Sequence, residues 1–415
     1  MALYPPFYAV MTSLPGIIVP GLGVVDLGAT FDVFLPRVRT MIVVLYVGLF
    51  AMSFDFISGY TGYLSFGHAM FFGIGAYLVI LAGTGRLPIL GPETPFMILL
   101  LLGAILAAVA ALVVGSVSFR LTGVYFAMIT LGFAEVAHVF IRNWDHVSSN
   151  PRDGAAVGGS VDAFQIGVPY VDSLSVGIGR LVGDSFQVGG VELSTATVSF
   201  YAIGLVVLGC YLAMQRIIHS PFGRVMIAIR ENEERARAIG YNTYWYKMAA
   251  FSISGFFGAV AGSLFAGYRR SVSPENTFDL FVTADALLAA IIGGFGTLAG
   301  SLYGHLFHEF VAGILTTESH GLARYLRDTL PEAILYAGAG DVTVVTVINV
   351  LIDGRAELYL GLVFILFVLF LPQGLLGTVR QRIGGTAAEK LPGYLRRALG
   401  RYRKHLSRYF RGTRP

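Results

Sequence analysis

The sequence has 415 residues, of which 55% are hydrophobic and only 13% are charged, with a formal net charge of +4. An ordinary soluble domain carries roughly a quarter charged residues, and here the charges fall in short intervals between long apolar runs. This composition excludes a soluble multidomain enzyme. It predicts an all-α, polytopic transmembrane helical bundle of about eight to ten spans, a class that the 52 glycines and 31 phenylalanines also favour.

A helix needs about 20 apolar residues to cross the hydrocarbon core of a bilayer. The strong candidates, in chain order, are residues 41–57, 64–83, 96–119, 121–141, 196–214, 248–268, 281–315 and 358–371. Two weaker candidates are 8–27, which is interrupted by Pro15 and Pro20, and 333–352, which contains Asp341. The stretch 281–315 is too long for one simple span, and a Gly-Gly pair inside it predicts either two short helices or one interrupted helix.

The distribution of basic residues predicts the orientation, because Lys and Arg gather on the cytoplasmic side. Residues 215–247 contain six of them, and from Arg380 to the end eleven stand against one acid. Residues 142–193 contain three Arg against six acids and are predicted to be an external loop. We therefore expect a membrane domain over 1–379 and a basic cytoplasmic tail over 380–415, which lies on anionic lipid or anchors the last helix rather than binding nucleic acid.

Residues 59–77 place five glycines and a histidine at membrane depth. Helix interiors disfavour glycine, and irregular backbone occurs in lipid only where protein or a water-filled cavity surrounds it. The pattern predicts either part of a solute pathway or close helix crossing through small residues, and the sequence leaves both open. The candidates here and in the later glycine-rich stretch are Gly62, Ser65, Gly67, His68, Gly73, Gly75, Gly293, Gly294 and Gly296.

Two further glycine patterns have the four-residue spacing that brings side chains onto one helix face. Gly258 and Gly262 form the first, and Gly296, Gly300 and Gly304 form the second. Both predict seams along which helices pack closely.

Ionisable residues inside the predicted spans are costly in hydrocarbon and are therefore functional candidates. They are Asp55, His68, Glu135, His138, Asp285, His305, His308 and Glu309. Glu135 with His138, and His305 with His308, are three residues apart and share a helix face, a spacing that metal ligation allows. The sequence offers no second set spaced to complete a metal shell. We therefore expect pairing or snorkelling near helix ends, with no metal or other cofactor bound by this chain.

Residues 220–247 carry the most specific signal. Within them, 224–239 has a helix-forming composition with Met226, Ile227 and Ile229 apolar on one side, and Gly240 is placed to end the helix. A short amphipathic helix between two spans predicts a docking element. An ordinary solvated loop is the alternative, and composition alone does not separate the two.

At these residues the sequence resembles the permease subunits of branched-chain amino acid ABC importers, the LivM type. Glu234-Arg-Ala236 followed by Gly240 is similar to the Glu-Ala-Ala…Gly coupling loop of ABC permeases, with Arg235 in place of the first Ala. Further similar blocks, in family order, are residues 62–77 with Ser-Phe-Gly-His-Ala, 121–131, 273–275, 291–301 and 372–377.

The resemblance implies that 1–379 is a permease domain that imports leucine, isoleucine and valine by ATP-driven alternating access and has no catalytic residues. It implies that residues 220–247, called the coupling segment below, touch an ATPase through Arg224, Arg230, Glu231, Glu234, Ala236 and Gly240. The partners implied are a second, LivH-type permease subunit, two ATP-binding cassette subunits that hold ATP and magnesium, and an external substrate-binding protein. The implied location is the plasma or inner membrane, with a cytoplasmic C-terminus.

Three other functions stay open at this point. Urea and short-amide permeases of the same family share nearly all of these blocks. An ion-coupled secondary transporter or a channel would use Asp285, Glu135 and His138 to relay protons. An intramembrane metalloenzyme would bind metal at Glu135 with His138, or at His305 with His308.

Overall fold

The structure of the chain is a computed structural model. The described residues are 1, 3–14, 17–19, 23–25, 28, 31, 35–92, 94–157, 165–166, 176–177, 186–188, 191–193, 195–315, 338–339, 342–343, 356–371 and 374–382. Everything below concerns these residues.

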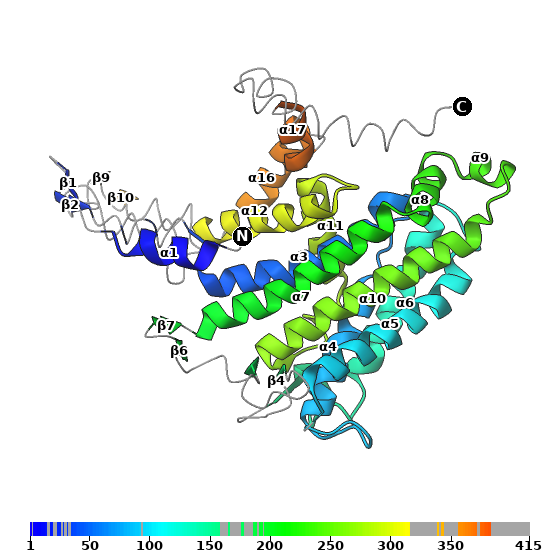
Figure 1. Ribbon diagram of the computed structural model, residues 1–415, viewed down its shortest axis with the longest axis horizontal. Helices are drawn as coiled ribbons and strands as arrows, with labels where there is room; N and C mark the ends of the chain where they lie inside the picture. The colour runs from blue at the N-terminus through cyan, green and yellow to red at the C-terminus, as the bar shows by residue number, and fades with distance from the viewer. Residues whose placement is uncertain are drawn as a thin grey trace.

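Five helices are long and apolar enough to cross a membrane, and they lie side by side in one bundle (Figure 1). They are α3 (Val38–Thr61), α5 (Phe96–Ser118), α6 (Val124–Arg142), α7 (Thr195–Ile218) and α10 (Thr243–Arg269). The pair α11 (Leu280–Gly293) and α12 (Leu298–Leu315) is bent by 107° and counts as a sixth span if it crosses as one unit. Two shorter apolar helices, α4 (Ala69–Gly83) and α16 (Ala356–Phe370), complete an all-α architecture, as predicted.

The remaining described elements are short. The helices are α1 (Tyr4–Thr12), α8 (Pro221–Glu231), α9 (Glu233–Ala238), α17 (Gly374–Arg382) and the 3-10 turn η1 (Pro151–Asp153). The strands pair antiparallel in twos: β1 (Ile17–Val19) with β2 (Gly23–Val25), β3 (Ala155–Ala156) with β8 (Ser271–Val272), β4 (Gln165–Ile166) with β5 (Val176–Gly177), β6 (Phe186–Val188) with β7 (Val191–Leu193), and β9 (Gly338–Ala339) with β10 (Val342–Thr343).

The strong span predictions each coincide with a helix, and the expected interruption of 281–315 is confirmed by the break between α11 and α12. The weaker span over 8–27 is wrong, because α1 ends at Thr12 and the β1–β2 hairpin follows. Proline removes a backbone donor, which a continuous helix there would need. Most of 333–352 lies outside the described residues, and the four that are described there pair as β9 and β10. The tail beyond 382 also lies outside them.

The core of the bundle forms around α3 and α10. Most of their residues are buried, and α4 and α5 pack against α10 while α7 and α12 pack against α3. The outer helices α5, α6 and α7 instead expose large apolar side chains, among them Ile105, Val136 and Leu205. Apolar faces of this extent suit contact with lipid or with another membrane subunit.

Glycine allows α4 and α10 to touch backbone to backbone. A Cβ atom at Gly75 would lie 2.1 Å from the carbonyl oxygen of Ala259, and one at Gly262 would lie 1.9 Å from that of Phe72. Both distances are too short for any side chain, so the predicted seam at Gly262 is confirmed.

The second seam is only partly as predicted. Gly304 on α12 lies so close to α11 that a Cβ would fall 2.0 Å from the carbonyl oxygen of Ala289. Gly300 likewise approaches Gly293, the last residue of α11. Gly296, however, precedes α12 and has φ 82°, so a three-member ladder on one helical face is wrong.

The loop after α6 and the segment before α10 lie at opposite ends of the bundle. Strands β3 and β8 pair just beyond the C-terminal ends of α6 and α10, whereas α8 and α9 stand at the N-terminal end of α10 (Figure 1). The described part of the predicted external loop and the coupling segment therefore lie at opposite ends, as the charge distribution requires.

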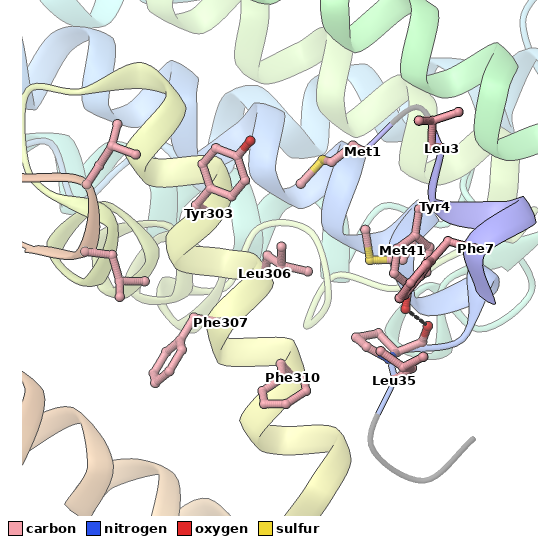
Figure 2. Close-up of a pocket in the computed structure, with 13 residues that line it drawn as sticks. Met1, Leu3, Tyr4, Phe7, Leu35, Met41, Tyr303, Leu306, Phe307 and Phe310 are labelled. Carbon is pink, nitrogen blue, oxygen red and sulfur yellow. Dashed lines mark hydrogen bonds between the residues drawn. The ribbon is translucent and has the colours of Figure 1, made fainter. Parts of the chain in front are cut away.

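An apolar groove runs between α1 and α12 and has a volume of about 740 Å³. Tyr303, Leu306, Phe307 and Phe310 of α12 line it opposite Phe7 of α1 (Figure 2). This flank of α12 is thus mainly apolar, whereas His305, His308 and Glu309 of the same helix are ionisable.

Candidate functional site

The coupling segment folds as two short helices. Pro221 occupies the first turn of α8, where proline is favoured, and the hydroxyl of Ser220 accepts the N–H of Gly223 as an N-cap. Asn232 then adopts an extended conformation that ends α8, and its side-chain oxygen accepts the N–H of Arg235 at 2.8 Å to start α9. The single helix expected over 224–239 is therefore wrong, because asparagine caps a new helix more favourably than it continues one.

The buried apolar side of α8 differs from the prediction by one residue. Met226 and Ile229 are buried as predicted, but Val225 is buried in place of Ile227, which is exposed. Ala236 of α9 joins Ile229 in a small cluster that packs against Tyr63. Gly240 has φ 96° just after α9, so glycine ends this helix as predicted.

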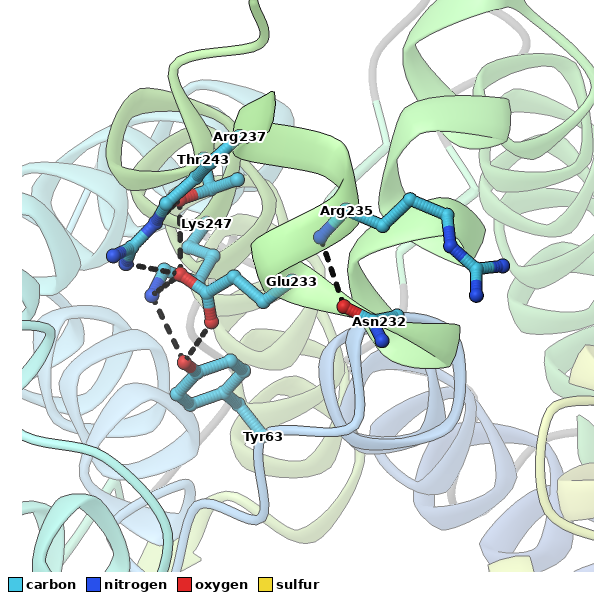
Figure 3. Close-up of polar contacts among 7 residues, drawn as sticks. All are labelled: Tyr63, Asn232, Glu233, Arg235, Arg237, Thr243 and Lys247. Carbon is cyan, nitrogen blue, oxygen red and sulfur yellow. Dashed lines mark hydrogen bonds and ion pairs between the residues drawn. The ribbon is translucent and has the colours of Figure 1, made fainter. Parts of the chain in front are cut away.

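Glu233, the first residue of α9, is the centre of a hydrogen-bonded network (Figure 3). Its carboxylate accepts from Tyr63 Oη at 2.6 Å, Lys247 Nζ at 2.8 Å, Thr243 Oγ1 at 2.9 Å and Arg237 Nη2 at 2.6 Å. Lys247 also donates to Tyr63 Oη at 2.9 Å. These five residues, called the Glu233 network below, join α9 to α10 and to the connection between α3 and α4.

The electrostatics of the network favour an ionised Glu233. Burial by itself would raise the pKa of the Glu233 carboxyl, but hydrogen bonds from Lys247, Tyr63 and Thr243 and the charge of Lys247 lower that pKa to about 2. Burial and the neighbouring carboxylate raise the pKa of the Tyr63 hydroxyl, which therefore stays a donor. Lys247 is 1% exposed, so its ammonium group depends on these partners for solvation.

Arg230, near the end of α8, is an exposed residue whose guanidinium contacts the ends of the membrane helices. Its guanidinium donates to the carbonyl oxygen of Gly59 in the last turn of α3. A Cβ on Gly296 would lie 2.7 Å from Arg230 Nη1, so the guanidinium also lies against the connection between α11 and α12.

Asp55 completes this contact from inside α3. Its side chain is fully buried, and Oδ1 accepts the backbone N–H of Gly296 at 2.8 Å. Gly59 and Gly296 approach so closely that a Cβ on Gly59 would lie 2.7 Å from the Gly296 nitrogen. Arg230 thus stands where two interruptions of the membrane helices meet, residues 62–68 after α3 and residues 294–297 after α11.

The other predicted coupling residues face outward. Arg224, Glu231 and Glu234 are exposed. Close to them, Ile239 and Trp245 are 68% and 63% exposed. Large apolar side chains among charges form the kind of surface that a partner protein covers.

The predicted pathway residues after α3 lie in tight packing. Gly62, with φ 79°, ends α3, and Ser65, Gly67 and His68 are buried. A Cβ on Gly67 would fall 2.1 Å from the carbonyl oxygen of Thr130 in α6.

His68 is enclosed within the core. Its Nε2 lies 3.1 Å from Ser53 Oγ and 3.4 Å from Ser254 Oγ. Rings of phenylalanines, Phe50 and Phe54 among them, surround it. Gly73 is also tightly packed, because it lies against the ring of Phe278.

Gly293 and Gly294 end α11, and Gly294 has φ 114°. With Gly296 they form the turn that bends the pair α11–α12. The interruption is therefore a protein-packed backbone, held in place by Asp55 and Arg230.

Two groups of side chains have donor atoms that suit a metal ion. In the first, Nδ1 of His138 lies 3.7 Å from Oε2 of Glu135, but the Glu135 side chain is 60% exposed, and no third ligand completes the group among the described residues. His305, His308 and Glu309 are close enough that one ligand atom from each lies within 4.8 Å of the others.

Sequence reasoning named Glu231 and Glu234 but missed the acid between them that anchors α9. The available signals were Asn232 followed by two acids, which is a helix N-terminus pattern, and Lys247, a lone lysine at the start of an apolar span. Tyr63 contacts Glu233 and Lys247, which lie 170 and 184 positions away in the sequence. No local sequence pattern reveals contacts over such separations.

Comparison with known proteins adds independent findings. The family model for the permease component of branched-chain amino acid transport systems matches residues 37–338. The high-affinity branched-chain amino acid transport system permease protein LivM of Salmonella typhimurium is 26% identical over 341 residues, which cover 81% of this chain and 68% of that protein. LivM of Escherichia coli matches to the same extent.

A relative with a shorter match is named for a different substrate. The fructose import permease protein FrcC of Rhizobium meliloti is 27% identical over 146 residues, which cover 35% of this chain and 38% of that protein. No solved structure matches this chain significantly.

Proposed function

Because the chain belongs to the family of permease components of branched-chain amino acid transport systems, we propose that it carries leucine, isoleucine and valine through the membrane as one permease subunit of an ABC importer. The family match and the bundle of apolar helices make it a transport permease that resides in a membrane. The substrate, the partners and the way in which ATP drives transport are the proposed part.

The observation that carries the coupling proposal is the attachment of α8 and α9 to both helix interruptions. A partner that pushes the exposed side of this segment, with Glu234 and Trp245, moves Glu233 and Arg230 on its inner side. Glu233 pulls on the connection after α3 through its hydrogen bond from Tyr63, and Arg230 pulls on Gly59 of α3 through a second hydrogen bond while it lies against Gly296 in the connection after α11. Interrupted helices bend at such points, so a small displacement outside becomes a rearrangement inside the bundle.

The proposed partners follow from the same division of labour. Two ATP-binding cassette subunits, which hold ATP and Mg²⁺, contact the coupling segment. A second permease subunit of the LivH type covers part of the exposed apolar faces of the outer helices, and an external binding protein delivers the substrate. The similarity to a LivH permease of Salmonella typhimurium, 24% identical over 62% of this chain, supports a related pair of subunits.

Site-directed crosslinking tests the contact with the ATPase. In a Cys210→Ala background, a cysteine replacing the exposed Glu234 should crosslink to a co-expressed ATP-binding subunit. A cysteine replacing Glu275, which is exposed near β8 at the other end of the bundle, is the matched control. Crosslinks from position 275 but not from 234 would show that the ATPase docks elsewhere.

Transport assays test the substrate. We expect ATP-dependent uptake of labelled leucine in proteoliposomes that contain the assembled complex, with competition by isoleucine and valine and none by urea or fructose. The longer match to LivM than to the fructose permease favours this outcome. Uptake of urea or fructose without uptake of leucine would contradict the proposed substrate but not the coupling mechanism. Uptake without any ATPase subunit would contradict the coupling mechanism itself.

A further inference from the structure

A second group of ionisable side chains lies on α12, away from the coupling segment. His305, His308 and Glu309, called the α12 cluster below, are spaced three and four residues apart and share one helix face. His305 Nε2 lies 3.7 Å from Glu309 Oε1, and the two imidazole rings stack at a centroid distance of 5.9 Å. The proposed transport mechanism uses none of these three residues.

The α12 cluster lacks the hydrogen bonds that buried polar groups normally make. His305 is 4% exposed, and its Nε2 has no hydrogen-bond partner among the described residues. Nδ1 of His308 is equally buried and unpartnered. Buried side-chain nitrogens are satisfied in the great majority of native structures, so two such atoms facing one carboxylate point to a ligand.

The surrounding charges leave room for a cation. Asp285 on α11 interacts electrostatically with His308 and Glu309, and Arg269 at the end of α10 interacts with Glu309. Two carboxylates therefore face one fixed positive charge, at membrane depth, where an unbalanced charge is costly. A cavity of about 230 Å³ between α12, α11 and α16 is lined by His308 among apolar side chains, so this imidazole borders open space.

We propose that the α12 cluster binds one divalent transition-metal ion of the zinc or nickel class through His305, His308 and Glu309. Two imidazoles and a carboxylate are donors that such ions prefer. Bonds of about 2.1 Å around a tetrahedral ion place ligand atoms roughly 3.4 Å apart. His305 Nε2 and Glu309 Oε1, 3.7 Å apart, are already close to that value. One ligand atom of each of the three residues lies within 4.8 Å of the others, so rotation of the side chains would close the site.

This proposal departs from the expectation, based on sequence, that the chain binds no metal. The sequence pattern indicated His305 and His308 as a pair without a third ligand, because Glu309 was considered there only as a single ionisable residue. An ion here would hold consecutive turns of α12 beside the bend with α11 and would neutralise the acids there.

The experiment measures zinc bound to the purified transporter complex. After treatment with EDTA, the complex is dialysed against a low concentration of Zn²⁺, and the bound metal is counted by elemental analysis. We expect the wild type to retain one Zn²⁺ per chain more than His305→Ala, and zinc affinity to fall at least about 10-fold in Glu309→Gln, because loss of a ligand exceeds the loss of an outer partner. His146→Ala, at an exposed histidine near η1, is the matched control and should bind like the wild type.

Glu309→Gln and His308→Gln keep the test decisive if His305→Ala fails to assemble, since both conserve size and hydrogen bonding. Equal zinc binding by the wild type and all three variants would overturn the proposal. Loss of zinc in His138→Ala instead would also overturn it, because the metal would then lie at the pair formed with Glu135. Neither result touches the proposed amino acid transport, which uptake assays measure separately.

Discussion

The Glu233 network and the α12 cluster both bring ionisable side chains close to membrane helices, but the two differ in how far those side chains are hydrogen-bonded. Each donor around Glu233 is supplied by this chain, from Tyr63, Arg237, Thr243 and Lys247. In the α12 cluster, two buried ring nitrogens have no donor or acceptor among the described residues. A satisfied network holds elements together, whereas an unsatisfied cluster is prepared for something that the chain does not contain.

The comparison predicts opposite responses to substitution. Removing Lys247, the buried cation of the Glu233 network, leaves Glu233 without its buried partner, so stability should fall steeply. Removing His305 from the metal-free α12 cluster removes a ring nitrogen that already lacks a hydrogen bond, so stability should hardly change.

Lys247→Met should lower the free energy of unfolding by about 3 kcal/mol, because removing one partner of a buried ion pair leaves the other uncompensated. The measurement is denaturant unfolding of the purified chain in detergent. Arg237→Met is the control, since the exposed arginine shares the same carboxylate and should cost less than about 1 kcal/mol. Similar losses in both variants would contradict the special place of Lys247.

Tyr63→Phe should lower the free energy of unfolding by about 1 to 2 kcal/mol. The substitution deletes one hydroxyl that donates to Glu233 and accepts from Lys247, and hydrogen bonds to charged groups contribute about that much. The same unfolding assay measures the effect. Tyr125→Phe, at an exposed tyrosine of α6, should be neutral, and an equal loss there would show that the network is not responsible.

The network also predicts a dependence of stability on pH. The pKa of Glu233 is about 2 in the folded chain and about 4.3 when unfolded, so the ionised form stabilises the fold. This contribution is fully present above about pH 4.3 and is lost as the pH falls toward 2. The difference in melting temperature between the wild type and Glu233→Gln should therefore narrow as the pH is lowered from about 7 to 3. A difference that stays constant would contradict the assignment.

His305→Leu should change the free energy of unfolding by less than about 1 kcal/mol when the protein is free of metal, because a buried ring whose Nε2 has no hydrogen-bond partner among the described residues is replaced by an apolar group of similar size. In the presence of Zn²⁺, the wild type alone should gain stability. Strong destabilisation of the metal-free variant would show that the imidazole already has partners and would break the comparison.

Much of the fold could be predicted because lipid imposes a simple rule on sequence. Runs such as 96–119 and 121–141 are readable from apolar length alone, and the glycine pair 293–294 indicated the bend between α11 and α12. The helix boundary at Asn232 was not predicted, because residues 224–239 have a helix-forming composition on both sides of it. The local cap formed with Arg235 decided the break.

The candidate site was predictable only in part. Exposed coupling residues such as Arg224 and Glu234 could be named from the resemblance, since they belong to one contiguous motif. The inner contacts could not, because Arg230 meets Gly59 and Gly296 only after distant helices have packed. The α12 cluster was visible as residue types, but its lack of hydrogen-bond partners is a property of the packed structure.

The most direct test of the account is transport by Arg230→Gln in proteoliposomes that contain the assembled complex. Arg120→Gln, at an exposed arginine between α5 and α6, is the control. We expect ATP hydrolysis to persist in Arg230→Gln while substrate uptake falls about 10-fold or more, because a charge-assisted hydrogen bond of about 1.5 to 3 kcal/mol links Arg230 of α8 to Gly59 in the last turn of α3. Uptake and hydrolysis that both match the Arg120→Gln control would contradict the claim that α8 drives the membrane helices through Arg230.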